Sequence, residues 1–135
     1  ISSVFVASFI GSPPMNLIPV QIDAQRQVRS TDGTVLDIAQ QAIPASLANR
    51  SVIMGMRPEH MHLHTPGVPV DIEMVEILGS EQLVHGRLGN TQIVLRCPVG
   101  LTASRPIQAG DKIQMGADSN HLLHWFDAET GKRID

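Results

Sequence analysis

The sequence predicts an all-β fold, either a barrel or a sandwich. Short apolar runs alternate with turn residues about every eight to twelve positions. Two of the turns contain Asp32-Gly33 and Gly89-Asn90, dipeptides that accept the positive φ of a tight hairpin. Beyond residue 15, no long run has the spacing of an amphipathic helix. We therefore expect short strands joined by tight turns.

The first half of the chain is expected to form four strands. They follow from apolar runs bounded by turn residues: 17–22, a second beginning at 27–29, then 34–38 and 51–57. Pro58 ends the fourth strand because proline has no N–H for a sheet hydrogen bond. Residues 44–49 predict a linker or one helical turn.

The second half contains the clearest internal break, at residues 65–69, Thr-Pro-Gly-Val-Pro. A strand is expected after it, with Val70, Ile72, Met74 and Glu76 on one face, because strand side chains alternate. Further strands are expected over 83–88, 91–97, 111–115 and 121–126.

The N-terminal run over residues 4–10 fits two structures. On a short helix its apolar side chains would lie close together, and Gly11 would end the helix. The same run fits a buried strand. It is too short to span a bilayer, and no basic region precedes it.

Composition narrows the class of protein. A chain of 135 residues suits one domain or two closely packed small barrels. A net charge of −3 and 3% aromatic residues give no basic or stacking surface for nucleic acid. Cys97, the single cysteine, forms no internal disulfide, which fits a reducing compartment. Its place before Pro98 favours a small buried hydrophobe over a reactive thiol.

The sequence contains no catalytic motif. Gly110-Asp111-Lys112 comes nearest to a phosphate-binding P-loop, but it lacks the upstream glycine and the hydroxyl residue. No Gly-x-Ser-x-Gly nucleophile motif occurs. Glu73, Glu76 and Glu81 are expected to be solvated, because no pattern predicts the pocket that acid–base catalysis needs. We expect no catalytic and no cofactor-binding residue in this chain.

Three alternating histidines are the candidate metal ligands. His60, His62 and His64 would point to one face of a strand, and Glu59 or His85 could complete a zinc shell. A solvated strand face or loop is favoured instead, because zinc ligands usually come from well-separated elements. We therefore expect no metal site.

Trp125 and Phe126 belong to the last expected strand. His121 and His124 lie three positions apart in it, so their side chains point to opposite faces. One of the two is expected to pack beside Trp125 as a partly buried histidine.

Four separated blocks resemble, in order, the regulatory region of carbohydrate-import ABC ATPases. The first two are Phe9-Ile10-Gly11-Ser12-Pro13-Pro14-Met15-Asn16 and Met54-Gly55-Met56-Arg57-Pro58-Glu59-His60. The third runs from Glu76 to Arg87, and the last from His121 to Gly131. The resemblance covers essentially the whole chain. It leans toward the glycerol-3-phosphate importer branch, with the maltose-importer branch as a near relative.

The resemblance implies an OB-like β-barrel of the TOBE or MOP-like type, with a short N-terminal linker helix. Residues 1–15 would be a linker from an ATPase domain and residues 16–135 the regulatory barrel, with a sub-boundary near 65–69. ATP and Mg²⁺ would bind that missing domain, so this chain would have no enzyme activity. The start at Ile1 is interpreted as a fragment or a processed product.

The resemblance also implies partners. The domain would contact a second copy of itself, its own nucleotide-binding domain and the membrane subunits of a transporter. It would lie in the cytoplasm at the inner face of the cell membrane. In some members of the family the domain docks a regulatory protein or senses substrate supply. Phe5 and Phe9 are expected to pack on the missing domain or on the barrel.

The candidate protein-contact residues lie in two rim segments: Arg57, Glu59 and His60, and Gly79, Ser80, Glu81 and Gln82. In the first, Pro58 turns the chain at the end of a strand. In the second, Gly79 supplies positive φ for a bulge or turn, which would expose the residues after it. An alternative for the first segment is a local ion pair between Arg57 and Glu59.

Two other functions stay open. An oxyanion or sugar-phosphate sensor would need convergent donors, for which Arg57, Arg87 and Arg96 are candidates. A metal-dependent enzyme would have to use His60, His62 and His64.

Overall fold

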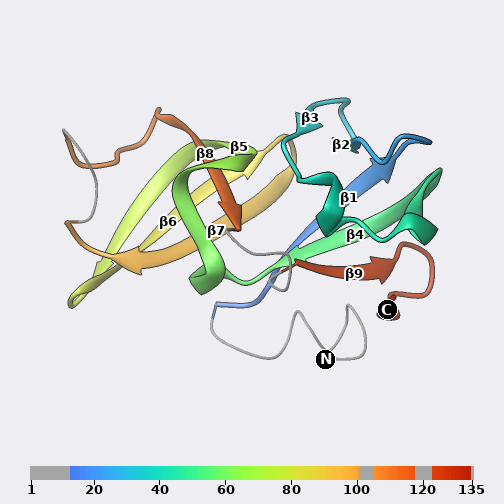
Figure 1. Cartoon of the computed structure of the whole chain (residues 1–135). Coiled ribbons are helices and arrows are strands. Elements are labelled where there is room, and N and C mark those ends of the chain that lie inside the picture. Colours follow the sequence, from blue (N-terminus) through green and yellow to red (C-terminus); the bar gives the residue numbers. More distant parts are fainter. Residues whose placement is uncertain (1–12, 101–104, 118–122, 135) are drawn as a thin grey trace.

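The computed structural model describes residues 13–100, 105–117 and 123–134, which form nine strands in two antiparallel sheets (Figure 1). The first sheet has the order β3-β2-β1-β4-β9. It contains β1 (Asn16–Ile22), β2 (Val28–Ser30), β3 (Val35–Leu36), β4 (Arg50–Met56) and β9 (Leu123–Asp127). The all-β prediction is confirmed.

The second sheet has four strands in the order β7-β6-β5-β8. It contains β5 (Met61–Leu78), β6 (Glu81–Leu88), β7 (Thr91–Pro98) and β8 (Lys112–Ala117). Three short 3₁₀ turns connect the described strands: η1 (Gln40–Ala42), η2 (Ala45–Leu47) and η3 (Pro58–His60). No helix among the described residues is long and apolar enough to cross a membrane.

The predicted turns form where local chemistry requires them. Gly33 has φ +90° between β2 and β3, and the Asp32 carboxylate accepts hydrogen bonds from Ser30 and Thr34. Those hydrogen bonds hold the pKa of Asp32 below its ordinary value. Gly89 has φ +59° in the two-residue loop that pairs Leu88 with Thr91. Both hairpin predictions are confirmed.

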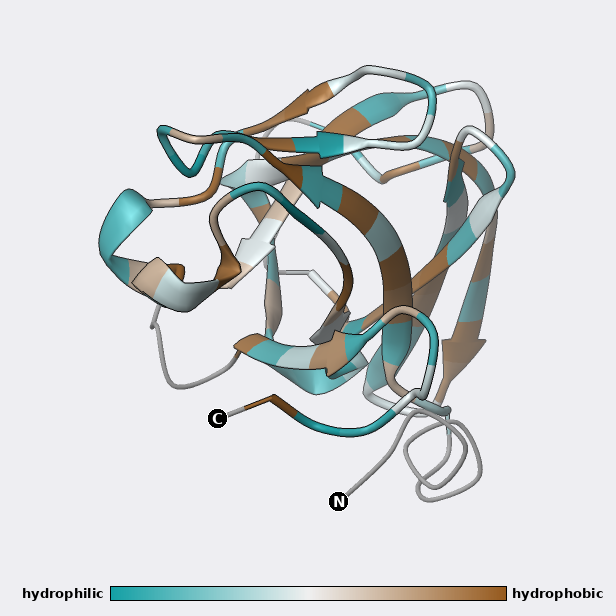
Figure 2. Cartoon of the chain, turned by 90° about the vertical axis from the view of Figure 1, so that its right-hand side faces the viewer, coloured by the Kyte–Doolittle hydropathy of each residue, from teal (hydrophilic) through white to brown (hydrophobic). Residues whose placement is uncertain are grey.

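The core lies between the two sheets and follows from strand alternation. Ile18, Val20 and Ile22 of β1 are at most 3% exposed, while the residues between them are partly or fully exposed. Figure 2 shows this alternation of hydrophobic and hydrophilic residues along the strands. Each such side chain contributes about 1.5–3 kcal/mol when it is fully buried. The core therefore needs neither a disulfide nor a metal.

The expected break at residues 65–69 lies inside β5, so the chain does not leave the sheet there. Leu63 and Val68 both pair with Met115 of β8, and the residues between them form a wide bulge. At Gly116 a side chain would collide with the carbonyl oxygen of Pro66, so the bulge requires glycine. The expectation of a strand break is wrong, whereas the domain boundary near this position stays a prediction.

A second irregularity in β5 reverses which side chains after Ile72 point toward the core. The pairing with β6 shifts between Ile72 and Met74, which marks a bulge at Glu73. Ile72 is 3% exposed, but Met74 is 51% exposed. The expected single face from Val70 to Glu76 is therefore wrong beyond Ile72, because the bulge inserts one residue and reverses the alternation.

The C-terminal block closes with a turn that its sequence explains. The Asp127 carboxylate accepts hydrogen bonds from the backbone N–H groups of Glu129 and Thr130, each at 2.8 Å. Gly131 has φ +71°, and residue 133 then pairs with Phe126 of β9. The expected linker helix and the side chains of Phe5 and Phe9 lie outside the described residues.

Candidate functional site

The first rim segment forms a tight turn between β4 and β5. Pro58 starts η3, and the backbone N–H of His60 donates to the carbonyl of Arg57 at 3.0 Å. Glu59 is exposed, whereas Arg57 and His60 are half-buried. The ion pairs among the described residues do not include one between Arg57 and Glu59, so the local-pair alternative is not supported.

The second rim segment is the turn that joins β5 to β6. Gly79 has φ +62°, as expected, and Gly79 and Ser80 are exposed. Gln82 is only 7% exposed, and its Nε2 lies 3.5 Å from the sulfur of Cys97 on β7. The expected exposure of Gln82 is therefore wrong, because it belongs to the inward-facing set of β6. The two rim segments lie at opposite ends of β5, which η3 precedes and the Gly79 turn follows (Figure 1).

The three alternating histidines do not share one strand face. His60 lies in η3, and β5 begins only at Met61. His64 has φ +58°, a left-handed conformation that turns its side chain out of the strand alternation. In the described ranges, no group of three or more His, Cys, Asp or Glu residues is placed to hold a metal ion. This arrangement of the three histidines does not support the hypothesis of a metal-dependent enzyme.

The three candidate arginines are also separated. Arg87 Nε lies 3.1 Å from Glu73 Oε2, and Arg96 Nε lies 3.4 Å from Glu81 Oε1. Both pairs lie at the surface of the second sheet, where such ion pairs contribute about 0–1 kcal/mol. Arg57 lies at the end of β4 in the other sheet. Because carboxylates already pair with Arg87 and Arg96, the structure does not favour one oxyanion site formed by these two residues and Arg57.

The expected solvated carboxylates are placed as predicted, whereas Cys97 is only half-buried, so the expectation of a buried cysteine is wrong. Glu73 and Glu76 are exposed and pair across strands with Arg87 and His85. Burial raises the pKa of the Cys97 thiol, although its hydrogen bond with Gln82 acts in the opposite direction. A thiol with a raised pKa carries little thiolate at neutral pH and is a poor nucleophile.

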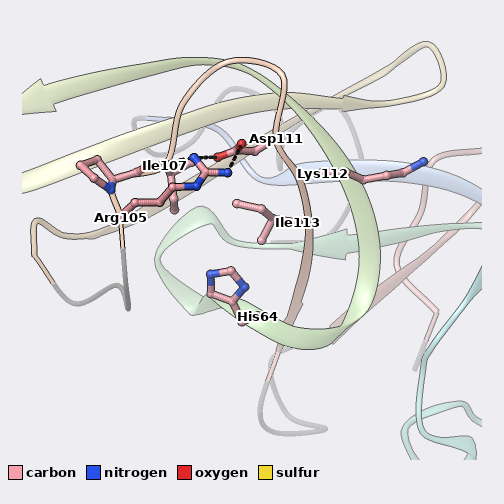
Figure 3. Close-up of a pocket in the computed structure, with 7 residues that line it drawn as sticks. His64, Arg105, Ile107, Asp111, Lys112 and Ile113 are labelled. Atoms are coloured by element: carbon pink, nitrogen blue, oxygen red, sulfur yellow. Dashed lines mark hydrogen bonds and ion pairs between the residues drawn. The ribbon is translucent and has the colours of Figure 1, made fainter.

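One pocket was not foreseen from the sequence (Figure 3). It has a volume of about 230 Å³ and is lined by His64, Arg105, Pro106, Ile107, Asp111, Lys112 and Ile113. Arg105 Nη2 donates to Asp111 Oδ1 at 2.8 Å, and this bond lowers the pKa of the carboxyl. Figure 3 shows Lys112 extending away from His64. Because Asp111 already neutralises Arg105, the pocket offers little net charge to a ligand.

A basic cluster was also missed, because it depends on the pairing of distant strands. His124 of β9 pairs with Gly55 of β4, which places it beside the strand end that leads to Arg57 and His60. The pKa of His124 is lowered to about 4, first by burial and then by the charges of Arg133, Arg57 and His60. His124 is half-buried, as expected for one of the two histidines, whereas its expected packing beside Trp125 stays a prediction; His121 lies outside the described residues.

Apolar side chains are exposed around the β5–β6 hairpin tip. Among the large hydrophobic residues that the structure describes, those more than 40% exposed are Val35, Met74, Ile77, Leu78 and Val99. Met74, Ile77 and Leu78 belong to the end of β5. In Figure 1 this tip lies at the left extremity, away from the five-stranded sheet. We call Met74, Ile77, Leu78 and Val99 the tip patch.

Two protein families match the chain in succession. The MalK OB fold domain matches residues 11–61, and the TOBE domain matches residues 54–125. The first match covers β1 to β4, and the second covers the four-stranded sheet and reaches into β9. Both matches fit the predicted OB-like fold.

The chain is also similar to import proteins from several bacteria. It is 49% identical over 134 residues to the sn-glycerol-3-phosphate import ATP-binding protein of Bordetella pertussis, covering 99% of this chain and 37% of that protein. The protein of the same name from Bordetella avium is 47% identical over 133 residues, 98% of this chain and 37% of that protein. A third, from Cupriavidus metallidurans, is 38% identical over 143 residues, with 99% and 38% covered. The chain thus spans little more than a third of these relatives.

Proposed function

This chain belongs to the TOBE domain family, and from that premise we propose that it is the regulatory and dimerisation domain of the ATP-binding subunit of an ABC importer. The observation that carries the proposal is the succession of the MalK OB fold and TOBE matches over residues 11–125. The names of the relatives favour sn-glycerol 3-phosphate as the cargo, with sugars as the second choice.

ATP hydrolysis is assigned to the other part of the parent protein. The match covers 37% of the Bordetella pertussis relative, and the sequence of this chain contains no P-loop pattern. ATP and Mg²⁺ would therefore bind outside this domain. The domain would act in the cytoplasm, at the inner face of the membrane, and contact its own nucleotide-binding domain and the membrane subunits. A regulatory protein is a further partner on this proposal.

The tip patch is proposed as the contact with a second copy. Its apolar side chains are about half exposed, and burying them would be favourable. Acidic and basic side chains lie around the tip patch as ion pairs, including Glu81 with Arg96 and Glu76 with His85. A patch with balanced charges avoids net repulsion when it meets the same patch of a second copy in an isologous contact. Each copy would thus hold the other while the ATP-binding parts open and close.

A domain exchange tests this function. The matching 134 residues of the Bordetella pertussis relative would be replaced by this chain, and uptake of labelled sn-glycerol 3-phosphate measured in cells that lack their own copy. We expect the exchange to retain uptake and deletion of the same region to lose it. Loss of uptake in the exchanged protein, despite normal abundance and ATP hydrolysis, would contradict the proposal.

A further inference from the structure

A small apolar groove lies on the outer face of the second sheet, near the turn between β5 and β6. It has a volume of about 170 Å³. The residues that line it are Pro13, Leu78, Glu81, Leu83 and Arg96. Pairing of Leu78 with Glu81 and of Leu83 with Arg96 sets these four side chains on one face. That face is the outer one, because Gln82 and Val84, which alternate with them on β6, are buried.

The chain enters the domain at the edge of this groove. Pro13 lines the groove and is the first residue that the structure describes. Three residues later, two hydrogen bonds of 2.7 and 2.8 Å fix the Asn16 side chain to the backbone of Val94. Val94 lies two positions before Arg96 on β7. The residues just before Pro13 therefore start from a fixed point beside the groove.

Phe9 is the aromatic residue nearest to this point of entry. It precedes Pro13 by four residues, which span at most about 14 Å when fully extended. Phe5 lies eight residues away, and closing that longer loop costs more conformational entropy. The shorter connection favours Phe9 as the residue that meets the groove.

The size and the charge of the groove match a phenyl ring. An apolar cavity of about 150 Å³ holds one benzene molecule, so a groove of about 170 Å³ has room for one ring. Glu81 and Arg96 at its edge already pair at 3.4 Å, which leaves no unbalanced charge for an ion. Leu78 is 51% exposed, and covering it with an apolar side chain would be favourable.

We propose that the phenyl ring of Phe9 binds in this groove, against Leu78, Leu83 and Pro13. Of the two surfaces on which Phe9 is expected to pack, another domain or the barrel, this inference selects the barrel. The other members of the tip patch stay available to a second copy. The inference concerns contacts within one chain, so it does not depend on the proposed function.

Nuclear magnetic resonance of the 135-residue chain tests the contact. We expect nuclear Overhauser effects between the ring protons of Phe9 and the methyl groups of Leu78 and Leu83. The ring should also shift these methyl signals upfield, because protons above an aromatic face are shielded. Absence of these effects from Phe9 in the folded chain would overturn the proposal.

Matched variants give a second test. Phe9→Ala should abolish the upfield shift of the Leu78 and Leu83 methyl signals. Phe5→Ala makes the same change four residues further from the groove and should leave the shift in place. If Phe9→Ala does not fold, Phe9→Leu removes the ring while keeping an apolar side chain. Loss of the shift in both the Phe9 and Phe5 variants, or in neither, would contradict the proposal, whatever the domain exchange shows for uptake.

Discussion

The side-chain amide of Asn16 pairs with the backbone of Val94, 78 residues further along the chain. Asn16 Nδ2 donates to the Val94 carbonyl at 2.7 Å, and Asn16 Oδ1 accepts from the Val94 N–H at 2.8 Å. Asn16 begins β1 of the first sheet, and Val94 lies in β7, an edge strand of the second. The amide thus takes the place of a neighbouring strand at one residue and joins the two sheets.

Replacing Asn16 should destabilise the fold strongly. Asn16→Leu leaves the Val94 N–H and carbonyl without partners, and we expect a loss of about 2–4 kcal/mol in the free energy of unfolding. Urea denaturation followed by circular dichroism measures it. Gln92→Ala, at an exposed position of β7, is the control and should change stability by less than about 0.5 kcal/mol. Equal stability of the two variants would show that the Asn16 pair does not join the sheets.

Two glycines should differ in their tolerance of alanine. At Gly116 the added carbon collides with the backbone carbonyl of Pro66, which cannot move without distorting β5. At Gly55 the nearest atom is the sulfur of Met15 at 2.5 Å, the end of a flexible side chain. We expect Gly116→Ala to cost about 2 kcal/mol or more and Gly55→Ala less. Thermal unfolding of both variants measures the two losses of stability. A larger loss in Gly55→Ala than in Gly116→Ala would show that the collision with the Pro66 carbonyl is not decisive.

His124 should make stability depend on pH in a defined window. Its folded pKa is about 4 against an ordinary value of 6.5, so between these values the unfolded chain binds a proton that the folded chain does not. Stability should therefore fall as the pH is lowered from 6.5 toward 4, by at most about 1–2 kcal/mol for a half-buried group. The pKa values of Asp32, Asp111 and Asp127 are lowered from 3.8, so their contribution is lost only below this window.

The His124→Gln variant is the check on this pH dependence. Its stability, measured by urea denaturation in phosphate-free buffer, should change less between pH 6.5 and 4 than that of the parent chain. An unchanged slope would mean that other groups titrate in this window and that His124 is not responsible.

Cys97 should react slowly with thiol reagents. Because burial raises the pKa of its thiol, the thiolate fraction at pH 8 is small and access is restricted. We expect modification by a chromogenic disulfide to be about tenfold slower in the folded protein than in urea. Equal rates in the two states would indicate an exposed thiol of ordinary pKa.

The turns could be predicted from the sequence because their chemistry is local. Asp32-Gly33, Gly79 and Gly89-Asn90 specify positive φ where they stand, and each forms the expected turn. The bulge at Glu73 could not be predicted in the same way. It arises from the register between β5 and β6, and it exposes Met74, which simple alternation places in the core.

Part of the candidate site could also be predicted, because it depends on the local sequence. Pro58 dictates a turn after Arg57, so the exposure of Glu59 follows from the local sequence. His124 lies beside that turn because β4 pairs with β9, about half the chain away in sequence. The partner of Asn16 is equally distant. Contacts of this kind leave no local pattern, which explains why the basic cluster and the Asn16–Val94 pair emerge only from the fold.

We propose that this domain holds two copies of an import ATPase together. Sedimentation equilibrium of the chain over a range of concentrations tests it most directly, with Leu78→Asp and Val35→Asp as matched variants. Leu78 and Val35 are 51% and 49% exposed, but only Leu78 lies in the tip patch. We predict a reversible dimer for the parent chain and for Val35→Asp, and a monomer for Leu78→Asp. A chain that stays monomeric at every concentration would contradict dimerisation through this domain, and a Leu78→Asp dimer would move the contact elsewhere.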